Sequence, residues 1–333
     1  MDDEEVKQLK QMRSDLRAYE PVDTYFAVGS ADLRRARDER MYLAVSLSDK
    51  TGKVNGYMWD NPEDFVDILR GNTYVHVQGL AKMHNGVLIL SIEQIRPVRD
   101  EEIDINDFLE VVPGGIDLWI GRLHDHIDLI RDANCRVLVK SFLDDCRFIE
   151  NFKISSAGLT VHHNYVGGLL EHSVNTMSHS LHACDKYPAL IDRDLLLTGS
   201  FLHDIGKLKE ISGEVTRKYT TVGKLFGHVS IGFLMMNERI RLIKNFPPDL
   251  GMLLGHMILS HHGSLEFGSP VRPASPEALA LHLIENMDAK MNRFYCALKN
   301  SQQDDEWSSY DKFLNTEICM LKYKKQAAVL QEV

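Results

Sequence analysis

The sequence predicts a multi-domain α+β protein in which a small N-terminal β-barrel precedes a larger, all-α helical bundle. Between Tyr25 and Val98 apolar and polar residues alternate with a period of two, which is typical of half-buried antiparallel strands. From Ile116 onward the apolar residues recur with helical spacing instead. The sequence PGG at 113–115 separates the two patterns and is a turn signal, so the two parts should meet near it.

The first part should contain five short strands. Alternation is clearest in YLAVSLSD at 42–49 and in VLILSIE at 87–93. DKTG at 49–52 and HNG at 84–86 are tight-turn signals, and NPEDFVDILRG at 61–71 predicts a short capped helix between the third and fourth strands. Five short strands with a helix at that place predict an OB-type barrel.

The domain boundaries follow from these patterns. The expected order is an N-terminal helical segment at 1–20, the OB-type barrel at 21–100, a linker at 101–115, and the helical domain at 116–333 with its core at 158–294. The linker corresponds to the acidic run DEEIDINDFLE, and breakers such as FPPD separate the helices that follow it. We detect no internal repeat.

The composition describes an ordinary globular protein of 333 residues, 44% hydrophobic and 26% charged. No apolar run approaches the roughly 20 residues that span a bilayer, and the acidic N-terminus is unlike a secretory signal, so we expect a cytoplasmic protein with no membrane partner. The five cysteines include no CxxC pair, which argues against a disulfide framework and a thiolate zinc site. A net charge of −10 excludes a globally basic nucleic-acid binder, so a polyanion would need local patches or bound metals.

Histidine and aspartate side chains recur among the apolar residues of successive helices in the second part. They are His172, His203, Asp204, His228, His261, His262 and Asp288. One such residue alone is usually a satisfied core residue, but imidazoles and carboxylates are costly to bury unless they are paired or metal-bound. Their joint recurrence therefore favours a shared cation. Imidazole and carboxylate ligands without thiolate suit Mn, Fe, Co, Ni or Zn in a catalytic site.

The order of these residues resembles the HD superfamily of metal-dependent phosphohydrolases. The resemblance runs from Gly158 to Phe294, and its most specific part is FLHDIGK at 201–207. HHNYVGGLLEHS at 162–173 and SHHGSLEFGSPVRP at 260–273 are similar, more narrowly, to the YhaM-type 3′-to-5′ exoribonucleases, which join an OB domain to an HD domain. The resemblance implies a metal-dependent exonuclease that shortens single-stranded RNA to nucleoside 5′-monophosphates, with single-stranded DNA left open as a substrate.

The resemblance also implies two divalent metal ions, with Mn²⁺ expected ahead of Co²⁺, Fe²⁺, Ni²⁺ or Zn²⁺. By this likeness the ligands of the first ion are His172, His203 and Asp288, and those of the second are His228 with one or both of His261 and His262. Asp204 is the candidate bridge and catalytic carboxylate, because on a helix it lies about 100° from His203 and keeps a second oxygen free. Two ions about 3.5–4 Å apart lower the pKa of a bridging water and accept charge from both reacting oxygens of a phosphodiester, which favours hydroxide attack at phosphorus.

Two further polar groups lie close in sequence to these ligands. Lys207 follows His203 by one helical turn, where its ammonium either meets a non-bridging phosphate oxygen, as a catalytic group, or faces solvent. His163 precedes His172 by about 14 Å along the axis if one continuous helix joins them. It could not then share the metal with His172, so we assign it to substrate contact or to the start of the helix, with a plain surface role as the alternative.

Other candidates depend on loops and helical phase. Arg272, on a loop near His262, is either a phosphate contact or a solvated loop arginine. His256 stands five residues before His261, about 140° round a helix, so a core or surface position is expected for it rather than a metal ligand. His282 is also expected to be structural.

Aromatic and basic residues gather in the first part. They are Tyr42, Tyr57, Trp59 and Tyr74 on or near strands, and Arg34, Arg35, Arg37 and Arg40 before the second strand. Barrels of this type recognise single strands by stacking bases on aromatic rings and by holding phosphates with basic groups. The alternative is that the rings fill the core and the arginines coat a loop. Coupling to a phosphodiester-cleaving centre favours nucleic-acid binding, with Tyr57 and Trp59 as substrate contacts.

Two other functions stay open on the sequence alone. The first is an enzyme with the same metal site that acts on a small nucleotide or a cyclic dinucleotide. Against the cyclic dinucleotide, the sequence GSLEFGSP after the paired histidines lacks the HHE and GYP elements of the HD-GYP enzymes. The other is a non-enzymatic binding module that has lost its metals, against which the complete ligand set weighs heavily. A homo-oligomer is compatible with all three functions.

Overall fold

The computed structural model describes residues 11–36, 38–70, 74–84, 86–99, 102–104, 107–108, 111–159, 163–212, 217–299 and 306–321. The main division of the chain falls between residues 110 and 111, inside the predicted linker, and each of the two compact units has its own apolar core. The start of the predicted N-terminal helical segment lies outside the described residues, and its described part holds only the short 3-10 helix η1 (Arg13–Asp15). None of the helices in these ranges is long and apolar enough to cross a bilayer.

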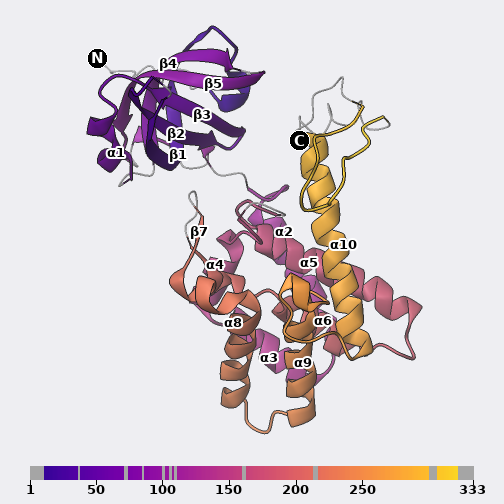
Figure 1. Ribbon diagram of the computed structural model, residues 1–333. Coiled ribbons are helices and arrows are strands. Elements are labelled where there is room, and N and C mark those ends of the chain that lie inside the picture. The colour runs from indigo at the N-terminus through magenta and orange to yellow at the C-terminus, as the bar shows by residue number, and fades with distance from the viewer. Residues whose placement is uncertain are drawn as a thin grey trace, which may run out of the picture. The chain divides into compact units, whose positions relative to one another are not determined.

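The first unit is a closed five-stranded barrel, which confirms the OB-type prediction (Figure 1). Its elements are β1 (Pro21–Arg35), β2 (Met41–Asp49), β3 (Gly52–Met58), α1 (Glu63–Arg70), β4 (Tyr74–His84) and β5 (Val87–Pro97). The strand order is β1-β2-β3-β5-β4, with β3 and β5 parallel and the other pairs antiparallel. The helix lies between the third and fourth strands in sequence, as predicted.

Alternation along the strands decides which side chains fill this barrel. In β2, Leu43, Val45 and Leu47 are buried, whereas the residues between them are partly exposed. The sheet can close because β1 and β4 each carry an irregularity in register. At the one in β4, Gly79 allows a close approach of β5, since a Cβ there would lie 2.2 Å from the carbonyl oxygen of Ser91.

The second unit is helical, and this confirms the predicted bundle. Its helices are α2 (Ile116–Asp128), α3 (Ala133–Leu143), α4 (Cys146–Ile154), α5 (Gly168–Lys186), α6 (Arg193–Leu202), α7 (Lys207–Glu210), α8 (Thr221–Leu242), α9 (Pro248–Ser260) and α10 (Pro276–Lys299). A small hairpin of β6 (Ile211–Ser212) and β7 (Lys218–Tyr219) interrupts them and was not expected from periodicity. Helix α5 packs against α2, α4, α6 and α10, so polar groups on α5 and α6 lie in the middle of the bundle.

The sequence predicts a helix that carries His203 and Asp204, but the structure places a turn at residues 203–206 between two helices, so that prediction is wrong. Helix α6 ends at Leu202, His203 caps it, and the next residues turn before α7 begins at Lys207. The turn packs closely on α8, because a Cβ at Gly206 would lie 1.9 Å from the carbonyl oxygen of His228. This contact brings the ligand of α8 beside the turn.

Candidate metal centre

The structure brings the seven predicted ligand residues together from five parts of the helical unit. They are His172 of α5, His203 and Asp204 after α6, His228 of α8, His261 and His262 at the end of α9, and Asp288 of α10. His172, His203 and His261 are completely buried, and Asp204 is 1% exposed. Burial of this many titratable groups in one place is costly unless they share a partner.

Asp204 lies between two pairs of imidazoles. Its Oδ2 lies 3.4 Å from Nε2 of both His172 and His203. Its Oδ1 lies 3.4 Å from Nε2 of His228 and 3.6 Å from Nε2 of His261. Each carboxylate oxygen therefore faces a different histidine pair, which is the arrangement required of a ligand that bridges two cations.

In three of these histidine rings, the hydrogen bond made by Nδ1 determines that Nε2 carries the lone pair. Nδ1 of His203 lies 2.7 Å from the carbonyl oxygen of Ser200, and Nδ1 of His261 lies 2.8 Å from that of Ile258. Nδ1 of His262 lies 2.7 Å from a third backbone carbonyl. A carbonyl can only accept, so each Nδ1 donates and each Nε2 keeps its lone pair for the centre, as in many histidine metal ligands.

Ring nitrogens of neighbouring histidines face each other at short distances. The Nε2 atoms of His172 and His203 are 3.1 Å apart, and those of His228 and His262 are 3.3 Å apart. Metal–nitrogen distances of about 2.0–2.1 Å place neighbouring ligands at about this separation. Among the described residues, Oδ1 of Asp204 and Nε2 of His261 are buried without a hydrogen-bond partner. The donor set thus fits divalent cations. It forms three groups, of which two meet at Asp204: His172 with His203 and Asp204, and His228 with His261 and His262. The third group joins Asp288 to His172 and His163.

Lys207 contributes a positive charge to the same place. It is 6% exposed, and its Nζ lies 2.5 Å from Oδ2 of Asp204, so the alternative of a solvent-facing lysine does not describe it. Burial raises the pKa of Asp204, but the charge of Lys207 is the largest of the effects that outweigh this and hold the pKa well below its usual range. The carboxylate is therefore ionised at neutral pH.

The two histidine groups differ in their electrostatics. Burial and the neighbouring His228 lower the pKa of His262 to about 4, and burial and His262 lower the pKa of His261 well below its usual value. Burial also lowers the pKa of His172, but hydrogen bonds to Asp204 and Asp288 outweigh it and bring this pKa to about 9. The first group thus attracts positive charge, while the second offers neutral imidazoles.

His163 lies beside this centre, although sequence spacing suggested otherwise. Helix α5 begins only at Gly168, so the continuous helix assumed between His163 and His172 does not exist. His163 is 2% exposed, and its Nε2 lies 2.8 Å from Oδ2 of Asp288. His162 lies outside the described residues. The burial of His163 favours a positioning role over the predicted contact with substrate.

Two carboxylates of the site were not singled out from the sequence. Glu210 accepts a hydrogen bond from the backbone N–H of His228 at 2.9 Å and faces its ring at 3.2 Å. Glu285 lies one turn before Asp288 on α10, and burial raises its pKa. In the sequence, the one signal for Glu285 is its spacing of three residues from Asp288, which places both on one side of a helix. Glu210 has no such signal, because it contacts His228 through the turn at Gly206.

The remaining candidates of the helical unit lie around the centre. His256 accepts a hydrogen bond from the backbone N–H of Ala274 at 2.8 Å, so it holds the loop before α10. His282 Nδ1 lies 2.9 Å from the carbonyl oxygen of His261 and supports the turn of the paired histidines. Arg272 is exposed on the loop between η4 (Leu265–Phe267) and α10.

The barrel carries an aromatic stack on its outer surface. Trp59 is 42% exposed and stacks on Tyr42 with ring centroids 4.8 Å apart. The guanidinium of Arg40 lies 5.2 Å from the Trp59 ring, and Tyr57 lies 6.0 Å from Tyr42. Tyr74, in contrast, is buried against Phe108. Three of the four aromatic residues selected from the sequence therefore form one surface, and the fourth is core.

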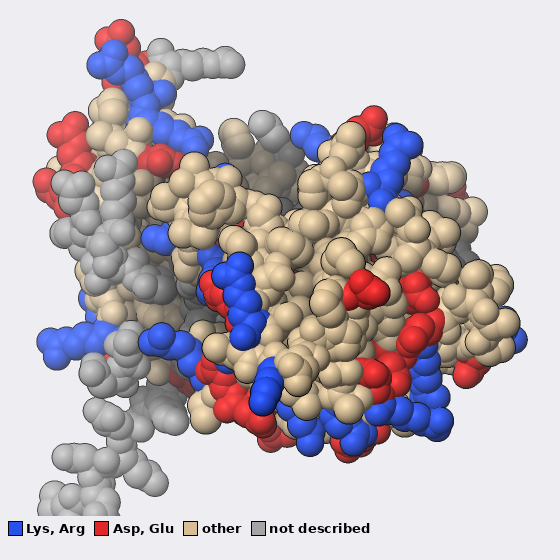
Figure 2. Space-filling view, turned by 90° about the horizontal axis from the view of Figure 1, so that it is seen from below, with Lys and Arg blue, Asp and Glu red and all other residues tan. Residues whose placement is uncertain are grey.

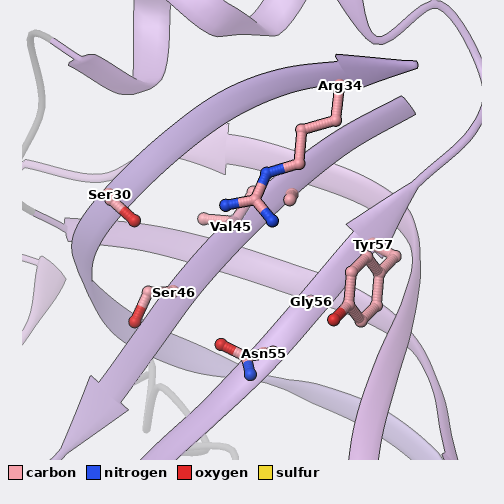
Figure 3. Close-up of a pocket in the computed structure, with 8 residues that line it drawn as sticks. Ser30, Arg34, Val45, Ser46, Asn55, Gly56 and Tyr57 are labelled. Carbon is pink, nitrogen blue, oxygen red and sulfur yellow. The ribbon is translucent and has the colours of Figure 1, made fainter. Parts of the chain in front are cut away.

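A hollow of about 160 Å³ adjoins this stack. Its polar lining includes Ser30, Arg34, Ser46, Asn55 and Tyr57. Figure 3 shows the Arg34 guanidinium and the Tyr57 ring extending over neighbouring strands on this surface. Cation, hydroxyl, amide and ring thus occur side by side, which are the groups that contact phosphate, ribose and base. Arg37 lies outside the described residues.

Comparisons with known proteins show what the chain is similar to. Residues 169–290 match the family model of the HD domain. The chain is 34% identical over 283 residues to the 3′-5′ exoribonuclease YhaM of Bacillus subtilis, which covers 84% of this chain and 88% of that protein. It is 35% identical over 290 residues to the 3′-5′ exoribonuclease YhaM of Shouchella clausii, covering 86% of this chain and 89% of that protein. The protein of the same name from Bacillus pumilus is 34% identical over 284 residues, covering 84% and 88%.

Proposed function

Because the chain belongs to the YhaM family of 3′-5′ exoribonucleases, we propose that it shortens single-stranded RNA from the 3′ end and releases nucleoside 5′-monophosphates with the help of two divalent ions. The observation that carries the proposal is the position of Asp204, whose two oxygens face two different histidine pairs. We propose single-stranded DNA as a second substrate to test, because the same hydrolysis can act on its phosphodiester bonds.

The residues that would hold the ions divide about Asp204. The proposed first set is His172, His203, Asp204 and Asp288, and the second is Asp204, His228, His261 and His262. Nitrogen and oxygen donors without thiolate suit Mn, Fe, Co, Ni or Zn. We propose Mn²⁺ ahead of the others, as the family resemblance implies. When bound, two such ions lower the pKa of a water and neutralise charge on the oxygens of a phosphodiester.

The chain's own charged groups complete the centre. The Lys207 ammonium holds Oδ2 of Asp204 and adds positive charge where a phosphate would approach. Arg272 is exposed, and we propose it as a contact to a phosphate farther from the reacting bond. On the face seen in Figure 2 basic and acidic side chains are interspersed, in keeping with the net charge of −10. Recognition of RNA would therefore depend on local groups.

The barrel supplies such groups on its outer surface. Trp59 and Tyr57 offer ring faces to unpaired bases, and Arg40 and Arg34 offer charge to phosphates. Stacking accepts any base, which suits an enzyme that removes nucleotides one after another. We propose that this surface retains the strand while the metal centre cleaves.

The test uses a 20-nucleotide single-stranded RNA labelled at its 5′ end, purified full-length protein and Mn²⁺. We expect a ladder of progressively shorter labelled products, and a 3′ label should leave at once as a mononucleotide. Immediate release of the 5′ label would contradict the direction. Intact RNA alongside hydrolysis of free nucleotides or a cyclic dinucleotide would favour the small-substrate alternative, and the Asp204→Asn variant controls for contaminating nucleases.

A further inference from the structure

The loop before α5 is built to hold His163 in an unusual backbone position. His163 has a φ of 46°, in the left-handed region that residues with a Cβ seldom adopt. The backbone N–H of His163 donates to Asn292 at 2.9 Å, and its carbonyl accepts from Ala157 at 3.1 Å. Gly168 is required here, since a Cβ on it would lie 2.0 Å from the carbonyl oxygen of His163. The conformation is thus fixed from several sides.

The ring of His163 spans two helices. Its Nδ1 lies 2.8 Å from Oε2 of Glu171 on α5, and its Nε2 lies 2.8 Å from Oδ2 of Asp288 on α10. The hydroxyl of Tyr165 also donates to Glu171. Because both ring nitrogens face carboxylates, His163 cannot rotate without losing one contact.

One oxygen connects this ring to the metal centre. Oδ2 of Asp288 accepts from His163 and also lies 2.7 Å from Nδ1 of His172. Nε2 of His172 in turn faces Nε2 of His203 at 3.1 Å. A continuous path, from Glu171 through His163 and Asp288 to His172, therefore ends at the position of the first ion.

We propose that His163 is a positioning residue of the metal centre, which fixes Asp288 and through it His172 in the orientation that binds the first ion. The inference rests on the metal centre of the proposed function and assigns a role to the HHNYVGG stretch. Partners of this kind, which hold metal ligands without touching the metal, change metal affinity by about 10–100-fold. The effect should fall mainly on the first ion, because the contacts of His163 lead through Asp288 to His172, a ligand of the first group.

The test compares two variants with a matched control in the full-length chain. His163→Asn tolerates the left-handed backbone but is too short to reach both carboxylates, and Glu171→Gln leaves the backbone of the loop untouched. His182→Asn is the control, since His182 is exposed on α5 and its Nδ1 lies 3.0 Å from the carbonyl oxygen of Ser178, away from the metal ligands. Protein stripped of metal is titrated with Mn²⁺ by calorimetry, and the unfolding midpoint of the metal-free protein is measured in parallel.

We expect two equivalents of Mn²⁺ in the wild type and in His182→Asn, with one of the two weakened about 10–100-fold in His163→Asn. Glu171→Gln should weaken the same equivalent by a smaller factor, and the midpoint should change little. Unchanged binding in both variants, or equal weakening of both equivalents with a large fall in the midpoint, would overturn the inference. Wild-type protein that binds no Mn²⁺ would instead overturn the metal centre itself, and the positioning role with it.

Discussion

Asp204 is the only described carboxylate whose two oxygens face both histidine groups, so its loss should have a different effect from the loss of a histidine. Asp204→Asn keeps the shape of the side chain but removes the charge that both ions would share. We expect metal content to fall from about two ions per chain to nearly none, together with activity. Elemental analysis of protein reconstituted with Mn²⁺ checks this, and retention of one full equivalent would contradict the bridging role.

His228 and His256 offer a matched comparison at the second ion. Nε2 of His228 points into the centre, whereas Nε2 of His256 accepts from the backbone of the loop before α10. At limiting Mn²⁺, His228→Ala should therefore lose about 100-fold or more in hydrolysis, and His256→Ala should lose little. Initial rates on labelled RNA measure both. Wild-type rates in His228→Ala would show that the second group holds no essential ion.

The chemistry of the residue types predicts the metal ligands well, but it does not predict which other residues lie around them. Imidazoles and carboxylates among apolar residues are rare enough that seven of them could be selected without a structure, and the structure brings all seven together. The place of His163 could not be predicted by helical geometry, because it depends on a reversal of the chain before Gly168. Glu210 was missed for the same reason, since it meets His228 only through a turn.

At the scale of elements, the N-terminus of α4 is joined to α8 by one side chain. Asp145 accepts from the backbone N–H groups of Arg147 and Phe148 at 3.0 and 3.2 Å and pairs with Arg239 of α8. We expect Asp145→Ala to be less stable than Asp145→Asn by about 1 kcal/mol at pH 7, because asparagine still caps the helix. Denaturant unfolding of the two variants measures the difference, and equal stability would show that the cap contributes nothing.

Asp145 also predicts how the free energy of unfolding changes with pH. The hydrogen bond from Arg239, followed by one from the backbone of Phe148, holds the pKa of Asp145 below its usual value. A carboxyl with a lowered folded pKa adds stability above its unfolded pKa of about 4, and this contribution is lost as the pH falls through the folded pKa. The stability advantage of the wild type over Asp145→Asn should therefore be present at pH 7 and shrink below about pH 4. An advantage that grows on acidification would contradict the assignment.

The elements themselves were predicted unevenly for physical reasons. Strands β2 and β5 show the period of two because one side of each is buried in the barrel, so their pattern is visible in the sequence. The hairpin of β6 and β7 has two residues in each strand, too few for any periodicity. The turn after α6 is not visible in the sequence because apolar residues continue through Ile205, whereas Gly206 packs closely on α8, a contact that only the structure shows.

At the scale of the whole molecule, the two units should divide the work between retention and chemistry. The exposed stack of Trp59 and Tyr42 would contact nucleotides remote from the reacting bond, whereas the buried ligands act at phosphorus. Interactions remote from the reaction change the retention of substrate and add little to the chemical step. Long RNA and a small reporter should therefore respond differently to changes in the barrel.

Trp59→Ala in the full-length protein tests this division, with Tyr19→Ala as the control because Tyr19 is a 72% exposed aromatic residue outside the stack. A stacked base contributes about 1–3 kcal/mol, so we expect kcat/KM on a 20-nucleotide RNA to fall about 10-fold in Trp59→Ala, mainly through KM. Hydrolysis of a nitrophenyl phosphodiester should stay at the wild-type rate, since that substrate never reaches the barrel. Added salt should weaken RNA binding in every form, because the phosphate contacts remain in the variant. Equal losses on both substrates, or no loss on RNA, would mean that the barrel does not retain the strand, and would favour an enzyme whose substrate is a small nucleotide.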